Sequence, residues 1–185
     1  SSIAVAPYVA RRVDPMLRDE PYTSWFVDCD AFGQFFDDYS PLHRATQADD
    51  LAARRARLAW LTSAHHLVVG SEGGSALLAS VIDFGQGITT PVIGWGDPDL
   101  SNPKSRYFVG RYFPPQGPAI FFKPSTMKDD YVYIYENPKS RVPLYEAAFH
   151  DSIVATHHWT APSMKFTNVA QTVEMFELLY ATPPL

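Results

Sequence analysis

The sequence predicts an α/β fold with parallel strands. Residues 23–30 (TSWFVDCD) and 65–72 (HHLVVGSE) are rich in aromatic and β-branched side chains, as buried strands are. Residues 46–64, between them, have the apolar periodicity of a helix. A strand, a helix and a second strand within some 50 residues form a βαβ unit, and its two strands must run parallel.

The N-terminal segment, residues 6–21, is expected to form one short helix or two, broken at Pro15 and Pro21. The helix of the βαβ unit is expected to begin after Thr46, because Asp49 follows three residues later as in a capping box. Three leucines give this helix an apolar stripe, and three arginines are expected outside it. These residues are Leu51, Leu58 and Leu61, and Arg54, Arg55 and Arg57.

The remaining chain is expected to continue the pattern less regularly. Residues 73–87 predict a short helix and a third partial strand. Residues 142–159 predict a strand near Phe149 or Val154, or one on each side of His150. Thr167 is expected to cap a final helix. Residues 94–141, between the third partial strand and the segment 142–159, hold many prolines and aromatics. An excursion of this length is usually a lid or a binding loop.

Composition sets the broad class of protein. With 185 residues, 46% of them hydrophobic, the chain suits one domain with a real core. A net charge of -5 argues against nucleic-acid binding, and no apolar run approaches the ~18 residues of a membrane span. The single cysteine, Cys29, cannot form an internal disulfide. The given N-terminus lacks the pattern of a secretory signal, so cytoplasmic and secreted locations both stay open.

Acidic residues follow both strands of the βαβ unit. Asp28 and Asp30 end the first strand segment, and Glu72, set among glycines, ends the second. Ligands of parallel α/β folds bind beyond the carboxyl ends of the strands, so these carboxylates could converge on one pocket. Two converging carboxyl groups are the equipment for cleaving a glycosidic bond. The alternative is that each acid only caps a turn.

A second group of polar residues lies in residues 142–159: His150, Asp151, His157 and His158, with His65 and His66 upstream. Such residues could bind a metal, could hydrogen-bond sugar hydroxyls, or could be structural, and their spacing matches no strong metal motif. Cys29 is a poor candidate nucleophile, because the acids on either side of it should raise the pKa of its thiol.

Several motifs in this order resemble one known family. The stretch WFVDCD, then YSP, then GSEGG, then FHD and a closing LLYATPPL is similar to bacterial (β/α)₈ glycoside hydrolases related to endo-α-N-acetylgalactosaminidases. The resemblance implies Asp28 as nucleophile and Glu72 as general acid/base of a retaining mechanism, with no cofactor or catalytic metal. It implies pocket roles for His150, Asp151 and Asp83. We also expect substrate-binding roles for Asp30, His157 and Trp159, which lie in the same segments.

A (β/α)₈ barrel takes about 250 residues, so the resemblance implies that this chain of 185 residues supplies the later strands only. The missing half of the barrel would come from another segment or chain, and without it the chain could be inactive. Two rival hypotheses remain: a non-catalytic carbohydrate-binding or assembly module, and a metal-dependent hydrolase using the His/Asp cluster. Substitution of Glu72 by Gln would separate the first rival from the glycosidase, and a chelator would separate the second.

Overall fold

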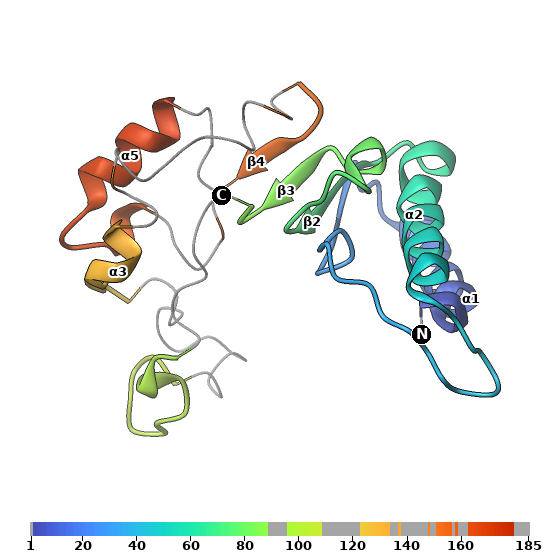
Figure 1. Cartoon of the computed structure of the whole chain (residues 1–185), viewed down its shortest axis with the longest axis horizontal. Coiled ribbons are helices and arrows are strands. Elements are labelled where there is room, and N and C mark those ends of the chain that lie inside the picture. The colour runs from blue at the N-terminus through green and yellow to red at the C-terminus, as the bar shows by residue number, and fades with distance from the viewer. Residues whose placement is uncertain are drawn as a thin grey trace. The chain divides into compact units, whose positions relative to one another are not determined.

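The computed structural model describes residues 2–88, 96–108, 123–133, 137, 148, 151–156, 158 and 163–179 (Figure 1). The chain divides into two compact units, Ser1–Gly85 and Gln86–Leu185. The prediction of a single domain stays a prediction. The helices are α1 (Ser2–Asp19), α2 (Gln47–Ala64), α3 (Asp129–Tyr131) and α5 (Ala170–Leu179), and the strands are β1 (Ser24–Val27), β2 (Val68–Glu72), β3 (Phe84–Gln86) and β4 (Val154–Thr156). Short 3₁₀ helices span Ala79–Val81, Pro98–Leu100 and Ser163–Lys165.

The predicted βαβ unit is confirmed. Strands β1 and β2 pair in parallel, with Ser24 opposite Val68 and Val27 opposite Ser71. Helix α2 connects them, and the sheet has the strand order β1-β2-β3-β4. The fold is therefore α/β, as predicted, and the register places the carboxyl ends of β1 and β2 side by side.

Helix α2 begins as predicted but buries side chains that were expected to face solvent. Thr46 is its N-cap, and the reciprocal hydrogen bonds with Asp49 form a capping box. Leu58 and Leu61 are buried, and so is Arg54. The expectation that the arginines lie outside the buried face is wrong for Arg54, which is buried, and for Arg57, whose largely buried side chain pairs with Asp30.

Helix α1 runs through both of its prolines. Pro7 and Pro15 lie inside the helix, so the predicted break at Pro15 is wrong. Proline removes one backbone hydrogen bond, and the carbonyl this frees in an exposed helix can be hydrated. Only Val13 of α1 is buried among the residues described there. Helix α2 packs against both α1 and strand β2 (Figure 1).

The second unit contains the predicted later strand and final helix. A strand forms at Val154–Thr156, as β4, whereas Phe149 and His150 lie outside the described residues. Helix α5 buries Val173 against Met127 and Phe166. Its first residue is Ala170, and the Thr167 hydroxyl contacts Ser125 and Thr126 instead of serving as the predicted cap.

The described parts of the aromatic excursion, residues 96–108 and 123–133, are tied together by one cation. Lys123 donates to both carboxylate oxygens of Asp97, at 2.9 and 2.8 Å, and pairs with Asp99 at 2.8 Å. These contacts join two segments of the excursion through residues that are 26 positions apart in the sequence. Its role as a binding loop stays a prediction. In the described part of the chain no helix is long and apolar enough to cross a membrane.

Candidate active site

The turn after β1 presents the first acid. Asp28 directly follows Val27, the last residue of β1, and its side chain is exposed. Cys29 comes next with a φ of 57°, a left-handed backbone conformation that residues other than Gly, Asn and Asp rarely adopt. The backbone N–H of Ala31 donates to Ser71 Oγ at 2.9 Å. This buried bond fastens the turn to β2 one residue before its end.

The end of β2 presents the second acid. Glu72 is the last residue of the strand and is half-buried. Gly73 follows with a φ of 68°, and a Cβ there would lie 2.6 Å from the ring of Phe32. Glycine is therefore needed both for its backbone freedom and for the close approach of the ring.

The structure brings the two predicted catalytic acids together. The register that pairs Val27 with Ser71 puts Asp28 opposite Glu72 at the next position. Carboxylate oxygens of these two residues and the Cys29 sulfur all lie within 4.8 Å of one another. The Cys29 thiol donates to Glu72 Oε2 at 2.9 Å and reaches Asp28 Oδ1 at 3.7 Å.

These neighbours keep the thiol protonated. The hydrogen bond to Glu72, burial, and the charges of Glu72 and Asp28 raise the pKa of Cys29 to about 12. The predicted direction is confirmed, but the main cause is Glu72 and not the flanking Asp30. Because thiolate is the nucleophilic and metal-binding form, Cys29 at neutral pH is a hydrogen-bond donor, and its one hydrogen goes to Glu72, the nearer acid.

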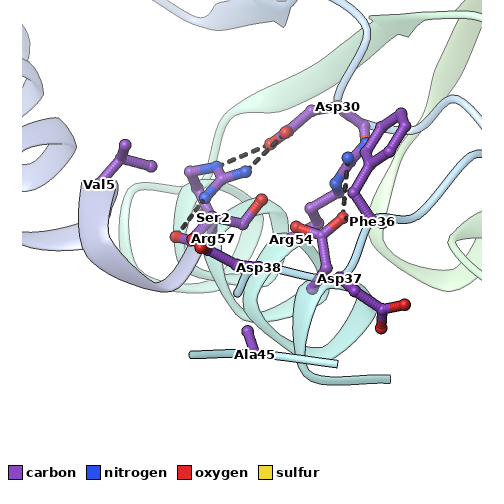
Figure 2. Close-up of a pocket in the computed structure, with 10 residues that line it drawn as sticks. Ser2, Val5, Asp30, Phe36, Asp37, Asp38, Ala45, Arg54 and Arg57 are labelled. Atoms are coloured by element: carbon purple, nitrogen blue, oxygen red, sulfur yellow. Dashed lines mark hydrogen bonds and ion pairs between the residues drawn. The ribbon is translucent and has the colours of Figure 1, made fainter. Parts of the chain in front are cut away.

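Asp30 lines a pocket whose lining includes neither Asp28 nor Glu72, and Figure 2 shows its carboxylate bound to Arg57. Its two carboxylate oxygens accept from Arg57 Nε and Nη2 at 2.7 and 2.6 Å. Both side chains are largely buried. Arg54 Nη1 adds longer contacts to the backbone oxygens of Cys29, at 3.4 Å, and Asp30, at 3.5 Å. Asp30 therefore anchors the turn to α2, and its substrate-binding role stays a prediction.

The pocket around Asp30 has a volume of about 570 Å³, and two ion pairs lie in its lining, Asp30 with Arg57 and Asp50 with Arg54. Asp50 pairs with Arg54 at 2.9 Å and accepts from the Phe36 amide at 3.2 Å. Burial opposes ionisation of Asp50, but hydrogen bonds from Ser2, Arg54 and Phe36 outweigh it and lower the pKa of that carboxyl. The lining residues are Ser2, Val5, Asp30, Phe36, Asp37, Asp38, Ala45, Asp50, Arg54 and Arg57.

Asp83, also predicted to bind substrate, is held in the sheet. Its Oδ2 accepts from the Val69 amide at 2.7 Å, and its own amide donates to Val69 oxygen at 2.7 Å. Val69 lies near the start of β2, whereas Glu72 lies at its end. Asp83 directly precedes β3, and its bonds with Val69 place it toward the start of β2, away from the end of that strand where the acid pair lies.

The predicted site residues of the later segment are mostly not described. His150, His157 and Trp159 lie outside the described residues, and Asp151 lies exposed in the turn before β4. Among described residues, the group of three or more potential metal ligands is Asp28, Cys29 and Glu72, and it includes neither Asp151 nor His158. His65 instead pairs with Asp14 at 3.3 Å and packs against Trp60.

Three residues that support the acids were not identified from the sequence: Ser71, Arg57 and Phe32. Arg57 lies three and four residues from buried Arg54 and Leu61, so helical spacing could have placed it on the buried face. Ser71 and Phe32 carried no comparable signal, because their contacts are made across the sheet and across the turn.

Comparison with known proteins gives a family and a fold. A search of curated proteins found no match. Solved structures of the alpha-N-acetylgalactosaminidase NagBb from Bifidobacterium bifidum match at 18% identity. The quadruple mutant has a TM-score of 0.50 over 81% of this chain and the GalNAc complex 0.49 over 82%. The chain spans 19% of the length of each of those proteins, and this likeness concerns the fold alone.

The family comparison covers the entire chain. The family described as glycosyl hydrolases related to the GH101 family, GH129, matches residues 1–185. This agrees with the resemblance of the WFVDCD, GSEGG and FHD motifs to that group of glycoside hydrolases. The chain belongs to glycoside hydrolase family GH129.

Proposed function

We propose that this chain carries the two catalytic carboxyl groups of a retaining glycoside hydrolase, with Asp28 as nucleophile and Glu72 as general acid/base. The observation that carries the proposal is the convergence of the two acids at the carboxyl ends of β1 and β2, with oxygens within 4.8 Å. Retaining enzymes hold their carboxyl groups about 5–5.5 Å apart, whereas inverting enzymes leave about 6.5–9.5 Å for a water.

The proposed reaction has two steps. In the first, an Asp28 oxygen attacks the anomeric carbon, the glycosidic C–O bond breaks, and the proton of Glu72 passes to the leaving oxygen. In the second, water attacks the same carbon and gives a proton to Glu72, while Asp28 leaves as a carboxylate. Both groups end in their starting protonation states, and no cofactor takes part.

We also propose that the chain forms the later strands of a (β/α)₈ barrel. Strands β1 and β4 are the outer strands of the sheet, so each could pair with a further strand. The remaining strands would come from another segment or chain.

The first test uses an aryl α-N-acetylgalactosaminide, chosen because the matched solved structures carry that activity in their name. We expect Asp28→Asn and Glu72→Gln each to lower kcat by at least about 10²-fold, because acid–base catalysis alone contributes about 10²–10⁴. The matched controls are Asp19→Asn and Glu174→Gln, which change exposed carboxylates elsewhere.

A second measurement tests the assigned roles. With an activated aryl leaving group, Glu72→Gln should still form the glycosyl-enzyme but hydrolyse it slowly, so mass spectrometry should find the sugar on the peptide containing Asp28. The sugar released by the unsubstituted protein should retain its anomeric configuration in NMR spectra. Inverted product would contradict the retaining mechanism. Sugar binding without hydrolysis, unchanged by Glu72→Gln, would support the non-catalytic carbohydrate-binding module instead.

A further inference from the structure

Cys29 lies between the two proposed catalytic acids but takes no part in the reaction described above. Its sulfur is 2.9 Å from Glu72 Oε2 and 3.7 Å from Asp28 Oδ1. The side chain is exposed, so a substrate that reaches the acids would also meet the thiol.

The backbone directs the thiol to this place. Cys29 has a left-handed φ of 57°, which is unfavourable for a residue with a Cβ. The surrounding turn maintains it through the Asp30–Arg57 ion pair and the bond from Ala31 to Ser71. Such strain is retained where neighbouring contacts over-determine the conformation, often at active sites.

We propose that Cys29 is a positioning residue, whose thiol holds Glu72 by its Oε2 atom and so assigns proton exchange to Oε1. The proposal rests on the proposed function of Glu72 as acid/base. With Glu72 ionised, the thiol donates to one oxygen of a carboxylate. With Glu72 protonated on Oε1, Oε2 is the carbonyl oxygen and still accepts the thiol hydrogen. One hydrogen bond thus serves both protonation states that the two-step reaction requires.

The charged groups around the thiol support a neutral donor at this position. Asp28 and Glu72 face it, while Arg54 contacts the backbone oxygen of Cys29 at 3.4 Å and Arg57 is occupied by Asp30. Among the described residues, the hydrogen-bond partners of the sulfur itself are the two carboxylates. Two negative neighbours disfavour thiolate, in agreement with the raised pKa of Cys29.

The first experiment tests the contact without requiring catalysis. Cys29 is the one cysteine of the chain, so alkylation by iodoacetamide followed by mass spectrometry reports on this thiol alone. We expect the native protein to react only at a pH well above that at which the urea-unfolded chain reacts. Glu72→Gln should move the reaction to lower pH, Asp28→Asn should move it less, and Asp19→Asn should leave it unchanged. Equal pH dependence in native and unfolded protein would overturn the proposal.

The second experiment tests the role in catalysis, with the aryl glycoside and three substitutions of Cys29. Cys29→Ala removes the donor, so the limb of the kcat pH profile that reports on Glu72 should move to higher pH, and kcat should fall about 10-fold while KM stays similar. Cys29→Ser keeps a donor and should restore most of kcat. Cys29→Gly lacks the thiol but suits the left-handed turn, so it should resemble Cys29→Ala in its pH profile.

The outcomes separate the two proposals. If the unsubstituted protein hydrolyses the glycoside and Cys29→Ala has an unchanged pH profile, the positioning role is wrong and the proposed function stands. If Asp28→Asn and Glu72→Gln leave hydrolysis unchanged, the proposed function fails, and with it the catalytic role of Cys29. If Cys29→Gly keeps full activity and Cys29→Ala loses it, the effect comes from backbone strain and the positioning role is wrong.

Discussion

The turn after β1 and the turn after β2 each present one carboxyl group, and each contains one residue with a left-handed backbone. In the first turn this residue is Cys29, and in the second it is Gly73. The first turn is held by side chains of α2 and β2, among them Arg57 and Ser71. The second relies on the absence of a side chain, with Phe32 packed against the glycine.

This difference indicates how each acid is positioned. Asp28 is exposed and belongs to a turn that long-range polar contacts keep in a strained shape. Glu72 is half-buried and ends a paired strand, so its backbone is already fixed by the sheet. The thiol of Cys29 connects the two turns. It belongs to the strained first turn and donates a hydrogen bond to Glu72 at the end of β2.

The largest stability effect should come from breaking the anchor of the first turn. Arg57→Met leaves the largely buried carboxylate of Asp30 without its partner, which should lower the free energy of unfolding by about 3–5 kcal/mol. Urea denaturation measures this loss. Arg18→Met, which removes an exposed pair with Asp19, is the matched control and should cost about 0–1 kcal/mol.

A double variant sharpens the same test. When Asp30 is also replaced by an apolar residue, as in Asp30→Leu with Arg57→Met, no buried charge is left unpaired and much of the loss should be recovered. If Arg57→Met costs no more than Arg18→Met, then the ion pair does not anchor the turn, and the contrast drawn between the two turns would be wrong.

The second turn should be sensitive to any side chain at Gly73. Gly73→Ala places a Cβ in a left-handed conformation and against the Phe32 ring, 2.6 Å away before adjustment, so a loss of about 1–2 kcal/mol is expected. Gly33→Ala is a suitable comparison, because a Cβ there meets only Ser75 at 3.4 Å and the backbone is not left-handed. Thermal unfolding of both variants would check this, and equal stabilities would contradict the requirement for glycine.

Features set by local sequence were predictable, and those set by distant partners were not. The Thr46–Asp49 capping box involves residues three apart, and the convergence of Asp28 and Glu72 follows from parallel strand order alone. The Asp30–Arg57 pair joins residues 27 apart, and several aspartates could have been chosen as the partner. Asp83 looked like Asp28 in sequence, as an acid after an apolar run. The run before Asp83, however, ends in a 3₁₀ helix, so the acid precedes its strand.

The effect with the narrowest range of conditions concerns the thiol that links the turns, because it appears only in alkali. The pKa of Cys29 is raised to about 12 in the folded protein, against about 8.5 for an unperturbed thiol in an unfolded chain. Between these values the unfolded chain loses the proton and the folded protein keeps it. The thiol's contribution to stability is therefore complete below about pH 8.5 and is lost progressively as the pH rises toward 12. The free energy of unfolding of the unsubstituted protein, measured relative to Cys29→Ala, should fall across this range, because tyrosine and lysine titrations are common to both proteins and cancel. A difference that stays constant with pH would mean that the thiol is not held by Glu72, and that the two turns position their acids independently.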